Sequence, residues 1–234
     1  MGLVVSILSG VLSSVLFVLI VEVYVRVRRS LDHRSIRSAT GISRPECTVV
    51  VPAFPVDSPV RDGLLSLNDA IALGFTLEVC SILKVKSTIM STKRIQDNLS
   101  SNIVVIGGPS GNDTTAALLR TYCPGFKIHN SGDFSRMFYE CGGHRFDDGR
   151  SSTSAFIVKL GPTRTNLTGA VMLLWGHYGV GTAAAAYFLN QHSKRLKKLG
   201  DGDSYFAAIS LNGNLGYRSV STSVLDISDG AFSD

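Results

Sequence analysis

The chain has few cysteines, and none of them stand at a metal-binding spacing. Cys47, Cys80, Cys123 and Cys141 are scattered singly, with no CxxC pair among them. Structural zinc sites usually draw their ligands from closely spaced pairs, so we expect no metal site. We expect buried free thiols instead, because single scattered cysteines in a reducing compartment behave as small core residues.

The sequence also lacks internal repeats, low-complexity segments and a basic folded part. It has 23 lysines and arginines against 18 aspartates and glutamates, a net charge of +5. Residues 26–44 hold six arginines and one aspartate, so this segment carries the whole excess and the rest balances at 17 against 17. Nucleic-acid binding usually needs a basic face on the folded part, so we expect no nucleic-acid partner.

Charge is absent from one long apolar run, which extends from Leu3 to Val21. As a helix that rises about 1.5 Å per residue, this run nearly matches the roughly 30 Å of a bilayer's hydrocarbon core. Arginines follow the run and none precede it, which is the reverse of a signal peptide. The positive-inside rule then places the N-terminus outside and the following chain in the cytoplasm. The pattern predicts a single-pass cell-membrane protein.

Three parts of the chain follow from this prediction: a transmembrane anchor at 1–25, a basic juxtamembrane linker at 26–45 and a cytoplasmic domain at 46–234. The arginine-rich linker suits an anionic bilayer surface, which attracts basic residues by about 1 kcal/mol each. The lipid bilayer is therefore the first expected partner. The remaining residues are enough for one well-buried domain.

The pattern in the domain favours a doubly wound α/β fold with a mainly parallel sheet. Apolar, β-branched runs alternate with helical spacing early in the chain, as in βαβ units. The expected strands are 47–54, 102–108, 154–160 and 170–175, and the expected helices are 64–83, 114–122 and 182–199. Near the end, two alternating runs flank Asn212-Gly213, which predicts an antiparallel C-terminal hairpin over 204–227.

Two glycine-rich loops, 107–115 and 176–182, each follow an expected strand and precede an expected helix. Glycine lets backbone N–H groups approach a ligand, and a helix N-terminus adds unpaired donors and the positive end of a dipole. Ligands of open α/β sheets bind at the carboxyl ends of the strands. We therefore predict a site for a small anionic ligand, formed by Gly107, Gly108, Asn112, Thr114, Gly176, His177, Gly179, Gly181 and Thr182.

Neither loop matches a specific nucleotide motif. A P-loop needs a lysine that is absent here, and the second loop reads GxxGxG, not GxGxxG. Glycines also serve tight turns, so plain turns stay an alternative. His177 in the second loop is either an acid or base near neutral pH or a turn histidine bonded to backbone.

Other candidates rest on single side chains. Cys141 and His144 stand three residues apart, a spacing compatible with a nucleophile and its base but not diagnostic of one. Asp147 and Asp148 are either metal ligands or part of an Asp-Asp-Gly turn, and the turn is the simpler interpretation.

The segments IVVIGGPSGNDTT (103–115) and LLWGHYGVGTAAAA (173–186), together with the apolar N-terminus, resemble a bacterial group. Its members are membrane-tethered and carry a Rossmann-like nucleotide-sensing domain, akin to the SLOG and Toll/interleukin-receptor-like groups of prokaryotic signalling and defence systems. The resemblance implies a nucleotide as the bound cofactor and a signalling role. It implies no catalytic residue, because Toll-like NAD hydrolases use a glutamate and none stands in a matching motif here.

Taken together, these features favour a membrane-tethered sensor that binds a small anionic ligand of the nucleotide class. One alternative is a nucleoside or nucleotide hydrolase or transferase. Another is a membrane scaffold that docks a protein partner or a second copy of the chain, with the two glycine loops serving only as turns.

Overall fold

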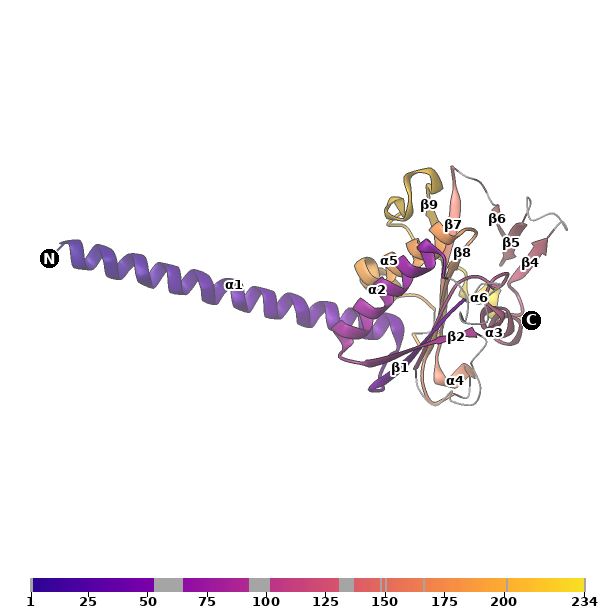
Figure 1. Ribbon diagram of the computed structural model, residues 1–234, viewed down its shortest axis with the longest axis horizontal. Coiled ribbons are helices and arrows are strands. Elements are labelled where there is room, and N and C mark those ends of the chain that lie inside the picture. Colours follow the sequence, from indigo (N-terminus) through magenta and orange to yellow (C-terminus); the bar gives the residue numbers. More distant parts are fainter. Residues whose placement is uncertain are drawn as a thin grey trace, which may run out of the picture.

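The computed structural model describes residues 2–52, 65–92, 102–130, 137–147, 149, 151–165, 167–200 and 202–233. It shows an α/β domain built on one seven-stranded sheet, with a second, three-stranded sheet beside it and a long N-terminal helix projecting from the body (Figure 1). The strands of the large sheet are β1 (Glu46–Val51), β2 (Lys86–Ser91), β3 (Asn102–Ile106), β7 (Thr153–Leu160), β8 (Val171–Gly176), β9 (Tyr205–Leu211) and β10 (Leu225–Asp226).

The large sheet is mixed, with the strand order β10-β9-β7-β8-β3-β1-β2. Strands β2, β1, β3 and β8 run parallel, whereas β7 pairs antiparallel with both β8 and β9. The prediction of a mainly parallel sheet is therefore wrong for this half. Residues 161–170, which include the short helix α4 (Pro162–Thr165), join β7 to β8. A parallel neighbour needs a longer crossover, so this short connection imposes an antiparallel pair.

The parallel half creates a switch point between β1 and β3. From β1 the chain passes through helix α2 (Leu67–Leu83) to the edge strand β2, and then returns to β3 on the other side of β1. Each residue of β3 and β8 is buried, as expected for strands covered on both faces. The carboxyl ends of β1, β3 and β8 consequently meet at one edge of the sheet, where such folds bind ligands.

Helices cover both faces of the sheet. One face carries α2, α5 (Gly179–Leu196) and the C-terminal turns of α1 (Gly2–Thr40), with α2 and α5 packed side by side. The other face carries α3 (Asp113–Tyr122), α6 (Ser228–Phe232) and the small sheet of β4 (Lys127–Asn130), β5 (Met137–Cys141) and β6 (His144–Asp147). Stacked and edge-on aromatic rings fill this second face, among them Phe126, Phe156, Trp175 and Phe206.

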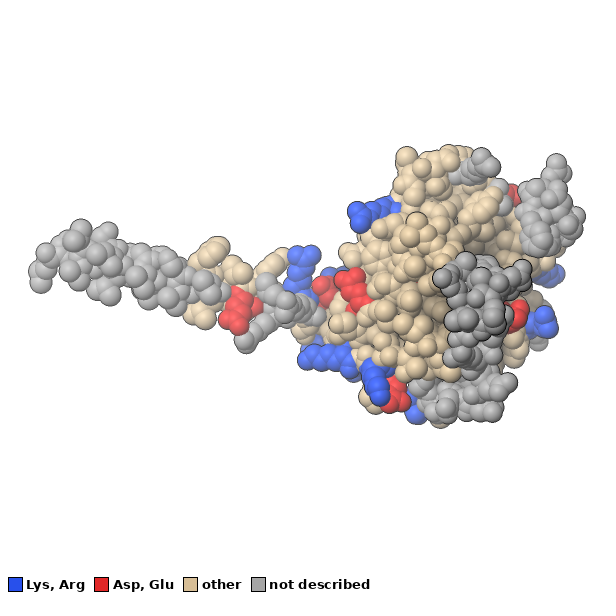
Figure 2. Space-filling view, viewed as in Figure 1, with Lys and Arg blue, Asp and Glu red and all other residues tan. Residues whose placement is uncertain are grey.

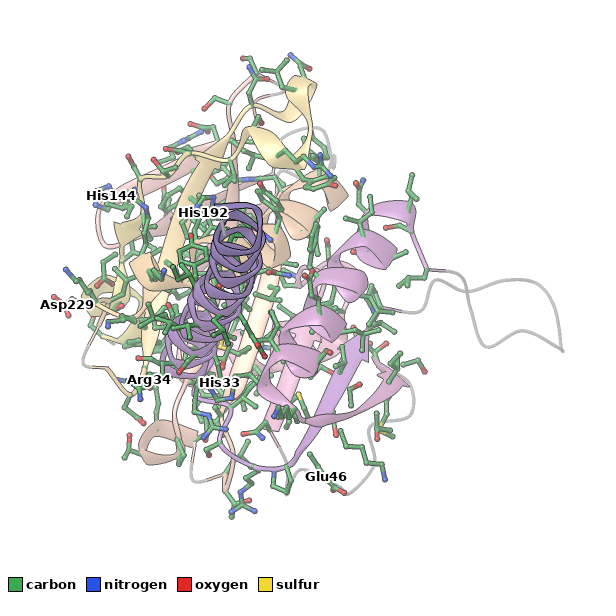
Figure 3. All side chains as sticks on the ribbon, turned by 90° about the vertical axis from the view of Figure 1, so that its left-hand side faces the viewer. His33, Arg34, Glu46, His144, His192 and Asp229 are labelled. Atoms are coloured by element: carbon green, nitrogen blue, oxygen red, sulfur yellow. The ribbon has the colours of Figure 1, made fainter. Side chains whose placement is uncertain are left out.

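Helix α1 joins the domain through its last turns. Ile36 and Ala39, and Ile42 just after the helix, are buried in the core with α2 and α5. Figure 3 looks along α1, which projects from the body toward the viewer. The segment 26–45 is thus helix as far as Thr40, and Ile36, Ala39 and Ile42 within it are buried. In Figure 2 acidic and basic side chains lie together where α1 meets the body. Lys194 of α5 forms an ion pair with Asp32 of α1 at 3.6 Å.

The predicted transmembrane anchor over residues 1–25 is wrong. Within the described part of the chain, no helix is both long enough and apolar enough to cross a bilayer. A bilayer-spanning helix needs about 20 consecutive apolar residues. The single-pass topology, the cell-membrane localisation and the cytoplasmic placement of the domain rested on this anchor and are withdrawn with it.

The antiparallel pairing of the predicted C-terminal hairpin is confirmed, but its predicted tight turn at Asn212-Gly213 is wrong. Strand β10 pairs antiparallel with β9, but only through Leu225 opposite Ala208 and Asp226 opposite Ala207. Two 3-10 turns, η3 (Gly213–Leu215) and η4 (Tyr217–Ser219), replace the tight Asn-Gly turn. The Asn212 side chain accepts a hydrogen bond from the amide of Asn214 and so begins the first of these turns. This bond draws the chain into a helical turn instead of a two-residue reversal.

Candidate functional site

A hollow of about 390 Å³ lies at the carboxyl ends of β1, β3 and β8. Its wall is formed by residues that follow β1, by both glycine loops and by the first turns of α2 and α5. The lining residues are Pro52, Ser66, Asn68, Asp69, Gly107, Gly108, Ser110, Gly111, Gly176, His177, Tyr178, Gly179 and Thr182. The two loops, which are far apart in the sequence, therefore face one shared space.

The loop after β3 is fixed by two buried side chains. Asn112 caps α3, because its Oδ1 accepts from the amides of Thr114 and Thr115 at 3.1 and 3.3 Å, while its Nδ2 donates to the carbonyl of Ile106 at 2.7 Å. The Thr115 hydroxyl donates to the carbonyl of Gly107 at 2.7 Å. Gly107 has a φ of +99°, a conformation that favours glycine. These contacts hold the loop in shape without a ligand.

The loop after β8 brings helix and strand into direct contact. A Cβ added to Gly176 would lie 2.5 Å from the Cα of Gly181, and one added to Gly181 would lie 2.7 Å from the Cα of Gly176. This close approach requires glycine at both positions, and it lets the start of α5 pack directly against the end of β8. Tyr178 is the N-cap of α5 and provides no side-chain cap, and no described residue accepts a hydrogen bond from the amides of Gly179 and Val180. These amides are available donors next to the hollow.

The third wall comes from the start of α2. Ser66 is the N-cap, and its hydroxyl accepts from the amide of Asp69 at 3.2 Å and donates to the Asp69 carboxyl at 2.6 Å. Asp69 is only 5% exposed. Burial raises the pKa of the Asp69 carboxyl above its ordinary value, and the Ser66 hydrogen bond opposes this shift. A buried acid of this kind in a hollow is characteristic of functional sites.

His177 lies in the wall with its ring turned toward the small sheet. Its Nε2 is 3.0 Å from the carbonyl of Phe146 in β6, and its ring packs against Tyr139 with centroids 4.5 Å apart. With Nε2 donating to that carbonyl, the imidazole joins β8 to the small sheet. This bond matches the interpretation of His177 as a histidine bonded to backbone.

Six of the nine predicted site residues line the hollow: Gly107, Gly108, Gly176, His177, Gly179 and Thr182. The other three, Asn112, Thr114 and Gly181, are not in its wall. Asn112 is fully buried and uses both polar atoms to hold the loop, Thr114 donates its amide to that cap, and Gly181 packs on β8. Whether the six contact a ligand stays a prediction.

Sequence reasoning missed the contribution of α2 to this wall. Ser66 and Asp69 stand in the S-x-x-D spacing of a capping box before an apolar run, which is a readable signal for a helix start. The apolar spacing predicts a helix from residue 64, whereas α2 begins at Leu67, after its N-cap Ser66. No pattern in the sequence indicated that this start faces both glycine loops.

The lining residues combine several hydrogen-bonding groups with little charge. Among the lining residues that the structure describes there is no lysine or arginine, and the titratable side chains are Asp69, His177 and Tyr178. Backbone amides and hydroxyl groups of Ser110 and Thr182 supply donors. Such a wall suits a ligand that has acceptor atoms on one side and donor atoms on the other.

The weaker candidates lie elsewhere. Cys141 and His144 face each other across the β5–β6 hairpin, at the wall of a separate hollow of about 330 Å³. Burial raises the pKa of the Cys141 thiol to about 11, which disfavours the thiolate that a nucleophile needs. Asp147 forms an ion pair with Arg145 at 2.8 Å, and Asp148 lies outside the described residues. Figure 3 places His144 at the edge of the molecule.

The prediction of buried free thiols is confirmed for Cys47, Cys80, Cys123 and Cys141. Burial raises the pKa of the Cys123 thiol to about 12. A hydrogen bond with the neighbouring thiol of Cys80, together with burial, raises the pKa of Cys47. All four therefore serve as core residues.

Fold and hollow define an α/β domain with a ligand-sized cavity at its switch point. Comparisons of the chain with protein-family models and with curated proteins find no match. The resemblance to SLOG and Toll/interleukin-receptor-like domains accordingly rests on the two short segments alone.

Proposed function

We propose that this domain binds a small anionic ligand of the nucleotide class in the hollow at the ends of β1, β3 and β8. The observation that carries the proposal is the meeting of both glycine loops with the first turns of α2 and α5 around one space. The volume of about 390 Å³ falls within the range of small-molecule sites. A sensor or regulator would use such a site to change its stability or its contacts when the ligand binds.

The donors support an anionic group at one side of the hollow. Gly179 opens α5 without a side-chain cap, and the loop before α3 places Gly108 and Gly111 in the wall. Helix N-termini and glycine backbones bind phosphate without any lysine.

Thermal unfolding of the full-length protein tests this proposal. We expect at least one of NAD, ATP, GTP and cyclic AMP to raise the melting temperature. A ligand at a hundredfold excess over its Kd adds about 2.7 kcal/mol, or roughly 5–10 °C for a chain of this size. No shift with any of the four at millimolar concentration would contradict the proposal.

Gly108→Ala is the matching site variant. Its new methyl would enter the wall, where the nearest atom is the Trp175 Cδ1 at 3.4 Å, so the fold accommodates it. Gly74→Ala is the control, because Gly74 is exposed on α2 and nothing lies within 4 Å of an added Cβ. We expect the first variant to reduce the ligand-induced shift and the second to preserve it.

A hydrolase or transferase that acts on the same ligand is the second candidate. Asp69 favours it, because a buried carboxyl whose pKa is raised can serve as a general acid or base. Chromatography of NAD, ATP and GTP after incubation with the protein tests this candidate. Formation of a product by the wild type, and its loss in Asp69→Asn, would support an enzyme. If all three nucleotides stay intact, the enzyme candidate is rejected and only the proposed binding function remains.

A further inference from the structure

Helix α1 carries a stripe of exposed apolar side chains on the part that projects from the body (Figure 1). Each side chain of the stripe is between 50% and 67% exposed. The stripe consists of Phe17, Ile20, Tyr24, Val27 and Leu31. A folded protein rarely exposes a contiguous apolar patch that has no partner, so the stripe indicates an interaction surface.

The spacing of the stripe is that of a coiled coil. Its members follow one another at intervals of three, four, three and four residues. Phe17, Tyr24 and Leu31 therefore take position a of a seven-residue repeat, and Ile20 and Val27 take position d. Helices with this period of about 3.5 residues wind around other helices of the same kind, and their a and d side chains form the seam between them.

The other described side chains between residues 17 and 31 fit this register. Val21 at position e and Val23 at position g widen the seam, so that seven of the eight exposed apolar side chains in this part of α1 lie at a, d, e or g. Leu19 at position c is the eighth. The described charged side chains lie off the seam, with Glu22 at the outer position f and Arg28 at e. This distribution indicates that the occupant of the stripe is a helix.

A hollow of about 440 Å³ lies along the same part of α1. Its lining residues are Leu19, Ile20, Val23, Tyr24 and Val27. All but Leu19 take the successive positions d, g, a and d, which are the four corners of a hole that receives a knob from a facing helix. In a parallel helix of the same sequence, the side chain at the level of this hole is another Tyr24. One sequence therefore supplies both the knob and the hole.

We propose that α1 forms a parallel, in-register coiled coil with α1 of a second copy of this chain, and that the stripe is the seam between them. A second copy fits because the stripe is complementary to itself: the large side chains at a enter holes that the smaller Ile20 and Val27 border. These β-branched residues at d, with Leu31 at a, also favour assemblies larger than a dimer, which use the same seam. The inference does not depend on a ligand at the strand ends.

Sedimentation equilibrium of the full-length protein tests the association over about a hundredfold range of micromolar concentrations. We expect the wild type to have the mass of at least two chains. Val27→Glu places a carboxylate in the seam of every strand and should weaken association at least about a hundredfold. Val21→Glu is the matched control, because it makes the same exchange at position e, where glutamate is common, and Val21 does not line the hollow. It should weaken association less than about threefold.

Val27→Leu covers the case in which the glutamate variant does not fold. Leucine keeps an apolar side chain at position d, where it is common in parallel coiled coils. We expect this variant to associate at least as tightly as the wild type. A monomeric Val27→Leu would contradict the seam.

Oxidative cross-linking tests the parallel register. In Tyr24→Cys the thiols of two facing a positions lie close enough to join, and with a copper catalyst dioxygen takes up the two electrons and two protons that they lose as the disulfide forms. The four native cysteines are buried and do not compete. Glu22→Cys, at the outer position f, is the control and should cross-link at least about tenfold more slowly.

Three results would overturn the inference. A monomeric wild type at every concentration would leave a different macromolecule as the occupant of the stripe. Equal weakening by Val27→Glu and Val21→Glu would show that association does not follow the seven-residue repeat. Cross-linking of Glu22→Cys as fast as that of Tyr24→Cys would exclude the parallel register. None of these results affects the proposed function, because ligand binding is measured at the other hollow.

Discussion

The ammonium group of Lys159 donates a hydrogen bond to the carbonyl oxygen of Ser38 at 3.2 Å. Lys159 lies in the buried strand β7 and is 5% exposed, and it also donates to the carbonyl of Gly202 at 2.8 Å. The Tyr205 hydroxyl donates to the neighbouring carbonyl of Ala39 at 2.8 Å. These donors satisfy the C-terminal carbonyls of α1, where the helix dipole is negative. They join the long helix to the sheet.

Lys159→Met should lower the free energy of unfolding by about 2–3 kcal/mol, because it removes two part-buried hydrogen bonds that a charged donor makes to the carbonyls of Ser38 and Gly202. Denaturant unfolding followed by circular dichroism measures this change. Lys194→Met is the control: Lys194 also joins α5 to α1, through Asp32, but its side chain is 67% exposed. We expect less than about 1 kcal/mol for this exposed pair. Equal losses in the two variants would contradict the anchoring role of Lys159.

Asn112→Ala should destabilise the protein by about 2–3 kcal/mol, since it removes an N-cap and leaves the buried Ile106 carbonyl unpaired. Asn214→Ala, at an exposed position in η3, serves as the control and should change stability by less than about 0.5 kcal/mol. Urea unfolding midpoints of the three proteins test this. A loss below about 1 kcal/mol in Asn112→Ala would mean that the loop before α3 is held by other contacts.

Gly74→Ala should stabilise the protein by about 0.5–1 kcal/mol, because alanine is the better helix former and its methyl meets nothing within 4 Å. Gly143 also has open space around an added Cβ, but its φ is +77°. Gly143→Ala should therefore destabilise by about 1–2 kcal/mol through backbone strain. Thermal denaturation of both variants should give shifts of opposite sign, and shifts of the same sign would refute the backbone argument.

Gly181→Ala should disturb the seat of α5 on β8, since its Cβ would lie 2.7 Å from the Cα of Gly176. Backbone atoms must move to relieve this contact, so we expect a loss of about 2–3 kcal/mol. Gly108→Ala adds the same methyl group at ordinary contact distance and should leave stability within about 1 kcal/mol of the wild type. If the melting temperature falls equally in Gly181→Ala and Gly108→Ala, the close packing of Gly181 on Gly176 does not determine the stability loss.

The stability of the wild type relative to Asp69→Asn should depend on pH. Because burial raises the pKa of Asp69 in the folded state, the folded protein holds this proton more tightly than the unfolded chain does. The contribution of Asp69 to stability is therefore fully present below the carboxyl's ordinary pKa of 3.8 and is lost as the pH rises through its higher folded value. Asp69→Asn should gain stability relative to the wild type between pH 4 and pH 7.

Unfolding free energies at several pH values in this range measure the difference. Ser66→Ala tests the cause, because the Ser66 hydrogen bond lowers the pKa of Asp69. Without this hydrogen bond the pKa of Asp69 should rise further. The stability of Ser66→Ala should therefore continue to decline up to a higher pH than that of the wild type. A constant difference between wild type and Asp69→Asn would show that the carboxyl is not desolvated in the folded protein.

Several elements could be predicted because their signals are local. The apolar run that contains Val49 and Val50 forms β1, the run from Asn102 to Ile106 forms β3, and the predicted helices coincide with α2, α3 and α5 apart from their ends. The edge strand β2 was missed, because its half-exposed side chains give no regular alternation. The short strands β4, β5 and β6 were missed for a similar reason, since they lie in a polar, glycine-rich stretch.

The sequence by itself determined the glycine loops, their position after buried strands and the helices that follow them, because strand and helix periodicity and the conformational freedom of glycine act over a few neighbouring residues. Only the tertiary structure decided that β7 runs antiparallel, that α1 ends in the core and that Asp69 faces both loops. These features depend on which distant segments pack together, and the free energy of that packing comes from contacts that no local window of the sequence contains.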